Sequence, residues 1–419
     1  MEPASHAPTL VTSEPLSAEL AEERRARFPI GASLTLAELE SYDLGVPLLR
    51  RLRAAEPVTW FEELQAWLVT PRPLVQEVLS SHDRFTVEAE RNLVRAVLGD
   101  HMLSRDGEAH RRQRAPYNPP LRLRPVQENY AQLIEDRAGH LLDSIEALAS
   151  AELRASYANP LAISVAGGAL GLAFGDIGHV AEIYDVFAAK MVTYDDPDVE
   201  RTTAPARAEL DAVVRENIRR MRANPDASII STVANAESPE LRRSDEEIVA
   251  NVRVLLFGAI ETVTSTILST TWALLTHPDQ LAQAVARPEL FASAVSEALR
   301  WIPPVGFSER WAAVDTELSG VQIRRGEMLL PSITSANRDP AVFPDPDLYD
   351  INRSNVLHHD AFSRGAHHCI GTNLANLEAR IGVQRLFERL PGLRQDPDVP
   401  STPTGFGFRS PQRLHVICR

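Results

Sequence analysis

The decapeptide Phe362-Ser-Arg-Gly-Ala-His-His-Cys-Ile-Gly371 constrains this chain more than any other stretch of its sequence. Gly365 and Gly371 give the backbone the freedom to form a tight loop around the Cys369 sulfur, with amide groups able to turn toward it. A lone cysteine is most often a small buried apolar residue. Here two glycines and His367 hold fixed offsets around the thiol, which favours a thiolate with a chemical role.

The overall composition excludes several classes of protein. A net charge of −14 argues against a nucleic-acid partner. Two cysteines in 419 residues give no disulfide framework, which suits a reducing cytoplasm, and we interpret Cys418 as inert. No stretch approaches the run of about 18 apolar residues that spans a bilayer, and residues 1–23 lack the features of a signal peptide. We therefore expect a cytoplasmic protein without a membrane partner, with a flexible segment at residues 1–25 and one domain over residues 26–419.

Hydrophobic periodicity predicts a mainly α fold with small β-sheets, that is, one large helical domain with a smaller β-rich N-terminal region. Residues 58–61 and 66–70 have the composition of strands. Alternation over residues 317–333 predicts further strands, and the tail 401–419 predicts a final hairpin. Apolar residues at three- and four-residue spacing predict helices over residues 130–149, 206–223, 245–275, 288–301 and 374–390.

Two polar residues interrupt the apolar helix that we expect over residues 245–275. Glu261 and Thr262 follow an apolar run that begins at Val254. Polar side chains inside an apolar helix cost free energy unless they have partners or a role. In one interpretation Thr262 bonds a carbonyl of its own helix and Glu261 faces solvent. In the other interpretation, the pair moves protons. The residues alone do not decide between the two interpretations.

Charged pairs at helical spacing occur twice. Glu297 and Arg300 lie three residues apart and can form an ion pair on one helix face. His110 and Arg114 lie four apart and face the same way. Taken singly, such pairs are usually solvated surface charges.

Together these motifs resemble those of the cytochrome P450 family, over residues 58–416. The decapeptide matches the family's haem-binding signature at Phe362, Gly365, His367, Cys369 and Gly371, and it departs at Ser363, where the family usually has glycine. The resemblance implies a P450 fold that binds haem b (iron protoporphyrin IX). It also implies that the Cys369 thiolate is the iron ligand, which pushes electron density toward the metal.

The resemblance also implies roles for the polar pairs. The segment 258–263 is similar to the family's distal-helix motif, so Glu261 would feed protons and Thr262 would steady the oxygen complex. Ala259 replaces a glycine of that motif, which would narrow the oxygen groove slightly. Two sets of residues complete the implied site. A structural Glu–Arg–Arg network would comprise Glu297, Arg300 and Arg353, and the haem propionates would be bound by His110, Arg114, Arg310 and His367.

Other surfaces of the site carry weaker signals. Ala259, Val305 and Phe307 are candidates for the substrate pocket, although each is more often ordinary core, and their apolar character suggests an apolar substrate. Three arginines near the thiolate side are either solvated charges or a basic patch on which an acidic ferredoxin could dock: Arg111, Arg112 and Arg364.

The activity implied by the resemblance is that of a soluble bacterial-type monooxygenase. Such an enzyme inserts one atom of O2 into an apolar small organic substrate, and the other atom leaves as water. A separate ferredoxin and ferredoxin reductase would supply electrons from NAD(P)H, since little chain follows Cys369. The alternatives are a peroxide-driven peroxygenase and a non-catalytic haem-binding protein. The presence of Glu261 and Thr262 argues against both.

Overall fold

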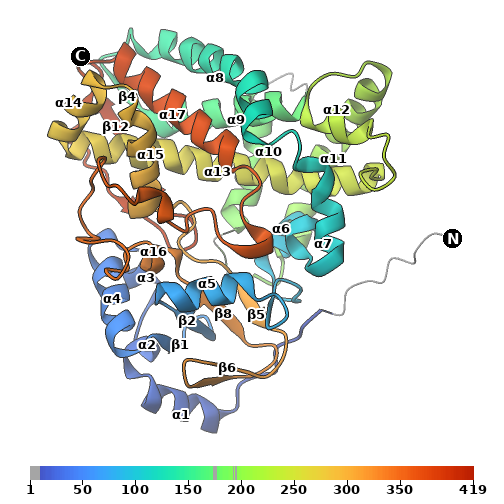
Figure 1. Cartoon of the computed structure of the whole chain (residues 1–419), viewed down its shortest axis with the longest axis vertical. Coiled ribbons are helices and arrows are strands. Elements are labelled where there is room, and N and C mark those ends of the chain that lie inside the picture. Colours follow the sequence, from blue (N-terminus) through green and yellow to red (C-terminus); the bar gives the residue numbers. More distant parts are fainter. Residues whose placement is uncertain (1–9, 173–176, 192, 194–195) are drawn as a thin grey trace.

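The computed structural model describes residues 10–172, 177–191, 193 and 196–419. Most helices gather in the upper part of Figure 1, and the largest sheet lies with helices α1 to α5 in the lower part. The predicted mainly α fold with small sheets is confirmed. The helices are α1 Ala18–Arg27, α2 Pro29–Ala32, α3 Leu36–Glu40, α4 Tyr42–Ala55, α5 Arg72–Ser80, α6 Leu93–Leu98, α7 Gly107–Arg114, α8 Leu123–Ile145, α9 Asn159–Leu170, α10 Ile177–Lys190, α11 Val199–Ala223, α12 Ile229–Ala234, α13 Asp245–Thr276, α14 Pro278–Ala286, α15 Leu290–Trp301, α16 Ile333–Ala336 and α17 Thr372–Arg389.

Helix α13 is the central element of the helical part and packs against α9, α11, α15 and α17. Its start is fixed by a capping box, in which Ser244 and Glu247 satisfy each other's backbone amides. Within the described residues, α13 is also the one helix long and apolar enough to cross a membrane, which corrects the expectation that no stretch approaches that length. Because most of that apolar stretch is covered by protein, we interpret α13 as the core helix of the fold.

The main sheet has five strands in the order β1-β2-β8-β5-β3. Strands β2 and β8 pair in parallel, and the other neighbours are antiparallel. The expected β-rich N-terminal region is therefore completed by two strands from much later in the chain. The bounds are β1 Val58–Phe61, β2 Ala66–Val69, β3 Phe85–Thr86, β5 Arg310–Ala312 and β8 Met328–Pro331.

The remaining strands form three smaller sheets. The predicted final hairpin forms between β10 and β11, while β12 joins β4 and β9 in a three-stranded sheet. Strands β6 and β7 pair with each other. Their bounds are β4 Ser150–Glu152, β6 Thr316–Leu318, β7 Val321–Ile323, β9 Arg394–Gln395, β10 Pro403–Thr404, β11 Ser410–Pro411 and β12 His415–Ile417.

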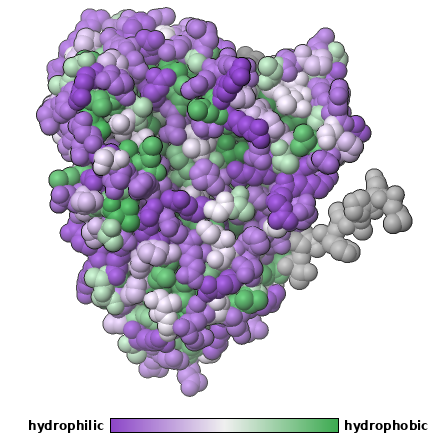
Figure 2. Space-filling model, viewed as in Figure 1, coloured by the Kyte–Doolittle hydropathy of each residue, from purple (hydrophilic) through white to green (hydrophobic). Residues whose placement is uncertain are grey.

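Alternation along the strands places a separate apolar core on each face of the five-stranded sheet. Trp60, Trp67 and Val69 contribute to one core. Leu68 and Trp311 contribute to the other. A third and larger core fills the helical part. On the molecular face in Figure 2, hydrophilic residues predominate and apolar groups are scattered among them.

Part of the N-terminal segment contacts the rest of the fold; residues 1–9 lie outside the described residues. Val11 forms a β-bridge with Ala89, and α1 is a regular helix. Arg24 of α1 is buried and ion-pairs with Glu327, just before β8. Local sequence pattern does not reveal these contacts, because the partners lie far away in the sequence.

Candidate active site

The loop before α17 holds Cys369 in a compact turn. The Cys369 amide donates to the Phe362 carbonyl at 2.8 Å, and a short 3₁₀ turn spans Gly365–His367. Gly365 has φ +68°, and a Cβ there would lie 2.9 Å from the Leu79 carbonyl oxygen, so only glycine fits without strain. Ser363 also has a positive φ of +60°, which explains why glycine is usual at that position.

The Cys369 residue keeps exposed surface, although protein atoms surround its thiol closely. Burial raises the pKa of this thiol, while the Gly371 amide, the Thr372 hydroxyl and the Arg114 charge all act to lower it. A Cβ at Gly371 would meet the Cys369 sulfur at 3.8 Å, so the glycine backbone lies close beside the sulfur. The residue is therefore exposed, and three groups around it act against the burial that disfavours the thiolate.

The middle of α13 has a stripe of residues that the rest of the protein does not cover. The helix is buried along most of its length, yet Leu255, Gly258, Ala259 and Thr262 are partly or fully exposed. These positions are three or four apart, so they form one stripe on the helix. A Cβ at Gly258 would meet no atom within 4 Å. This uncovered stripe, together with the exposed cysteine, fits the haem that the sequence motifs imply.

Two histidines of the predicted propionate set lie side by side. The rings of His110 and His367 have centroids 4.3 Å apart, and both residues are buried. His367 Nε2 lies 2.8 Å from Asp106 Oδ1, while the Nδ1 atoms of both rings lack a partner among the described residues. Buried unpaired nitrogens are rare in folded proteins, so these two fit an anionic group such as a carboxylate.

Burial and hydrogen bonding shift the pKa values of His110 and of Asp106, the partner of His367. Burial lowers the pKa of His110 to about 4. Burial acts to raise the pKa of Asp106, but hydrogen bonds from His367 and Thr86 outweigh it and lower that pKa to about 2. Asp106 was not among the residues predicted from the sequence.

The two arginines of the predicted propionate set donate hydrogen bonds to backbone carbonyls. Arg114 donates to the carbonyls of Ala366 and His368 at 3.0 and 2.7 Å, so it anchors the cysteine loop. Arg310, at the start of β5, donates to the Ser308 hydroxyl at 3.0 Å and the Glu309 carbonyl at 2.7 Å. Burial lowers the pKa of Arg310 to about 10, so this buried guanidinium remains a cation at neutral pH.

The acid and the alcohol of α13 have different partners. Thr262 donates to the Gly258 carbonyl at 2.6 Å, which is the back-bonding that one interpretation expected. Glu261 does not face solvent, because its side chain is only 15% exposed. Its carboxylate accepts hydrogen bonds from the Tyr184 and Ser265 hydroxyls and lies 3.5 Å from Arg154.

The structure brings Glu297, Arg300 and Arg353 into one buried network. Arg300 donates to both oxygens of Glu297 at 2.7 Å, and both side chains are 0% exposed. Arg353 donates to the same carboxylate at 3.1 Å. The two arginines also bind carbonyls of the coil between α16 and the cysteine loop, at Asn337, Pro344 and Pro346. The geometry suits a structural rather than a chemical role.

The candidate pocket residues do not all lie at the surface of the site. Ala259 and Val305 are partly exposed, whereas Phe307 is buried and stacks on Phe406 at 4.2 Å. Phe307 is therefore core in this structure. Phe408, at the tip of the final hairpin, forms a β-bridge with Val305 and is partly exposed. The sequence predicted the hairpin but not that its residue Phe408 lies beside Val305.

The three arginines near the thiolate side are each paired. Arg111 bonds Glu108, Arg112 bonds Glu247 and Arg364 bonds Asp360. The sequence left open whether these arginines are solvated or form a basic patch. Their carboxylate partners reduce the positive field that such a patch would present.

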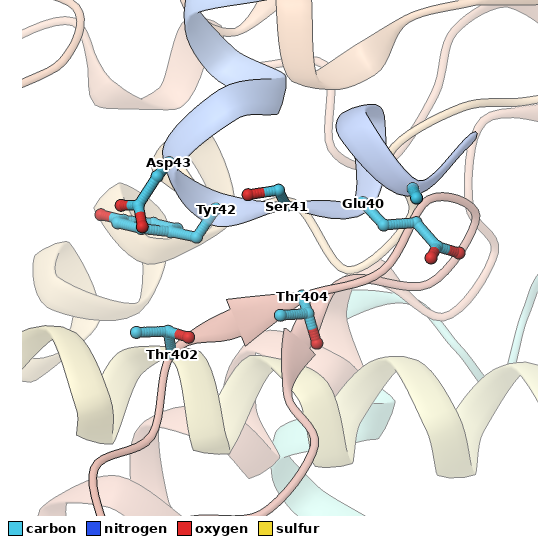
Figure 3. A pocket seen from close by; sticks show the side chains of 7 residues that line it. Glu40, Ser41, Tyr42, Asp43, Thr402 and Thr404 are labelled. Carbon is cyan, nitrogen blue, oxygen red and sulfur yellow. The ribbon is translucent and has the colours of Figure 1, made fainter. Parts of the chain in front are cut away.

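Two surface cavities are separate from these residues. One of about 340 Å³ lies between the α3–α4 link and β10, where Tyr42 and Asp43 lie across from Thr402 and Thr404 (Figure 3). The second, of about 320 Å³, is bordered by Leu93 on α6, among other residues. Neither is lined by Cys369, Glu261 or Thr262.

Comparison with known proteins identifies the family. The family model for cytochrome P450 matches residues 177–418. This chain belongs to the cytochrome P450 family. Mycinamicin IV hydroxylase/epoxidase from Micromonospora griseorubida is 32% identical to it, over 92% of this chain and 100% of that protein. The predicted family and its monooxygenase class are thereby confirmed.

Solved P450 structures share the fold. The structure of the polyketide synthase P450 PksS from Bacillus subtilis 168 has a TM-score of 0.81 and 30% identity, covering 91% of this chain and 98% of that chain. P450BioI in complex with hexadec-9Z-enoic acid ligated acyl carrier protein has a TM-score of 0.81 and 27% identity, covering 89% and 98%. The family implies a haem cofactor, and the residues described above fit it.

Proposed function

We propose that this P450 inserts one oxygen atom from O2 into an apolar small organic molecule, with the other atom leaving as water. The observation that carries the proposal is the pairing of an accessible cysteine, in a strained and well-anchored loop, with an uncovered stripe on an otherwise buried helix. The relatives include a hydroxylase/epoxidase and a polyketide biosynthesis P450. Their names support a substrate from secondary metabolism.

The bound haem would supply the activation of O2, which no side chain of this protein can perform. Cys369 would bind its iron, and the Gly371 amide would stabilise the thiolate. The stripe on α13 would contact the cofactor. Glu261 and Thr262 would hold and pass protons, since a carboxylate and a hydroxyl can exchange protons with water.

Of the four side chains predicted to bind the propionates, His110, His367 and Arg310 would do so directly. The unpaired Nδ1 atoms of His110 and His367 and the buried charge of Arg310 support this assignment. Arg114 would act mainly on the loop, because its terminal nitrogens already bind two carbonyls. The Glu297–Arg300–Arg353 network would hold the coil that leads to the cysteine.

Substrate and electrons would come from different partners. Ala259, Val305 and Phe408 would contact an apolar substrate, because they are among the partly exposed apolar residues around this site. Electrons would come from NAD(P)H through a ferredoxin reductase and a ferredoxin. Bacterial P450s generally use such partners, which supports this assignment.

The experiment that tests the cofactor assignment uses the two cysteines of the chain. Cys369→Ser is expected to abolish the red-shifted Soret band of the reduced carbon monoxide complex, because serine supplies no thiolate. Cys418→Ser is the matched control and is expected to keep that band, since Cys418 is buried near the chain end. A Cys369→Ser protein that retains the band would refute the proposal.

A further inference from the structure

The Glu261 carboxylate is held by three side chains, one from its own helix and two from other elements. The Tyr184 hydroxyl on α10 donates to one carboxylate oxygen. Ser265, one turn later on α13, donates to the other oxygen at 3.1 Å. Arg154, in a π-turn over Arg154–Ala158, lies 3.5 Å from that second oxygen. The position of this acid is therefore set by contacts outside the acid–alcohol pair.

These contacts continue into the final hairpin. Arg154 donates to the Ser410 hydroxyl at 2.7 Å, and the Ser265 and Ser410 hydroxyls lie 3.2 Å apart. Ser265 and Ser410 are buried, so the network is closed off from solvent at this end. Within the described residues, no hydrogen bond joins Glu261 to Thr262, whose hydroxyl donates to the Gly258 carbonyl.

Tyr184 is suited to hold an anion. The residue is 4% exposed, and its ring stacks on Phe257 with centroids 5.8 Å apart. Burial raises the pKa of the Tyr184 phenol, and the nearby Glu261 charge raises it further. The phenol therefore stays protonated and acts as a donor. Its partner differs from those of Tyr157 and Tyr349, whose hydroxyls donate to backbone carbonyls.

We propose that Tyr184 is a positioning residue for proton delivery: its phenol fixes the Glu261 carboxylate against α10, so the supply of protons depends on the contact between α10 and α13. The inference rests on the proposed role of Glu261. A catalytic group displaced by about 1 Å can lose a hundredfold in rate. Without the phenol, the carboxylate keeps only Ser265 and Arg154 and is expected to shift toward them. Removing one hydrogen bond to a charged group changes the equilibrium between two positions of that group by about tenfold.

The test compares Tyr184→Phe with Tyr157→Phe in the haem-loaded protein. Tyr184→Phe keeps the ring packing on Phe257 and removes only the donor. Tyr157→Phe is the matched control, because it removes an equally buried hydroxyl that donates to the Gly382 carbonyl at 2.7 Å. A plant-type ferredoxin, its reductase and NADPH supply electrons without added substrate. The measurements are the rate of O2 consumption, the share of O2 recovered as peroxide and the solvent isotope effect.

Tyr184→Phe is expected to slow O2 consumption by about tenfold and to increase both the peroxide share and the solvent isotope effect. Tyr157→Phe is expected to match the parent protein in all three. An unchanged isotope effect in Tyr184→Phe would overturn the proposal. Loss of haem from Tyr184→Phe would also overturn it, because that result would indicate a purely structural contact.

A third variant separates this inference from the proposed function. Glu261→Gln removes the acid itself and is expected to change the same measurements at least as strongly as Tyr184→Phe. If Glu261→Gln has no effect, the proposed role of Glu261 fails and the inference fails with it. If Glu261→Gln has an effect and Tyr184→Phe has none, only the positioning role is refuted.

Discussion

At the scale of single residues, Ser363 has a strained backbone conformation that reduces the stability of the cysteine loop. Its backbone has φ +60°, a conformation that costs a residue with a side chain about 1–2 kcal/mol. Its hydroxyl is buried and lacks a partner among the described residues. The loop holds the strained conformation because its ends are fixed, with the Ser363 amide on the Asp360 carbonyl at 2.8 Å.

Ser363→Gly is therefore expected to stabilise the protein. Glycine relieves the backbone strain and removes the unpaired hydroxyl, while its extra freedom in the unfolded chain offsets part of the gain. The expected net change is about 1 kcal/mol in the free energy of unfolding, measured by chemical denaturation. Ser319→Gly is the control, because Ser319 has φ +53° but is exposed and should gain less. Equal gains would show that the hydroxyl contributes nothing.

Single residues of the site divide clearly into those that the sequence could predict and those that it could not. Cys369 and the Glu297–Arg300 pair were predictable because fixed spacing within a loop or helix identifies them. Tyr184 lies 77 residues from Glu261, and no local pattern connects them. Asp106 likewise meets His367 across 261 residues. Only the folded chain reveals such partners.

At the scale of elements, α1 shows how one side chain attaches a helix to a sheet. The Arg24 guanidinium lies 4.2 Å from the centre of the Trp60 ring and 4.7 Å from that of Trp67. It also pairs with Glu327, which accepts a hydrogen bond from the Trp67 indole at 2.7 Å. An arginine whose charge is paired and whose plane covers aromatic rings can stabilise a buried contact.

Arg24→Met is expected to release α1 from the sheet. The substitution leaves the Glu327 charge without its cation, which costs about 3 kcal/mol for a buried pair. Hydrogen–deuterium exchange should then increase over residues 10–27. Arg25→Met is the control, because Arg25 forms an exposed pair with Glu62 and little change is expected. Unchanged exchange in Arg24→Met would contradict the attachment.

The predicted helices and strands agree with the structure where the local sequence pattern determines the secondary structure. Residues 58–61 form β1 as predicted, because aromatic and β-branched residues suit a strand buried on both faces. Helix 130–149 instead runs over Leu123–Ile145, since Pro125 is tolerated in a first turn. The contact between Arg24 and Glu327 was not predicted, because it joins residues far apart in the sequence.

At the scale of the whole molecule, the buried Glu297 network joins the helical part to the coil before the cysteine. Arg300 donates hydrogen bonds to the carbonyls of Asn337, Pro346 and Leu348. The sequence located the ion pair by its spacing, but spacing alone predicts an exposed pair. Its complete burial follows from the packing of α15 against α13 and α17.

Glu297→Gln is expected to weaken haem retention. The substitution leaves two buried guanidinium groups without a carboxylate, and breaking such a pair costs about 3–5 kcal/mol. The rate of haem transfer to apomyoglobin measures the effect, and we expect it to increase at least tenfold. Glu317→Gln is the control, because Glu317 is exposed on β6 and its carboxylate accepts a hydrogen bond from the Gln322 side chain. Equal transfer rates would contradict the structural role.

The five tryptophans are distributed among the three apolar cores of this molecule. Trp60 and Trp67 lie in one core of the sheet and Trp311 in the other, while Trp272 and Trp301 stack at 5.9 Å in the helical core. Each group loses its apolar surroundings only when its own core opens. A variant that keeps a single tryptophan can therefore report, by its emission wavelength, when the core around that residue melts.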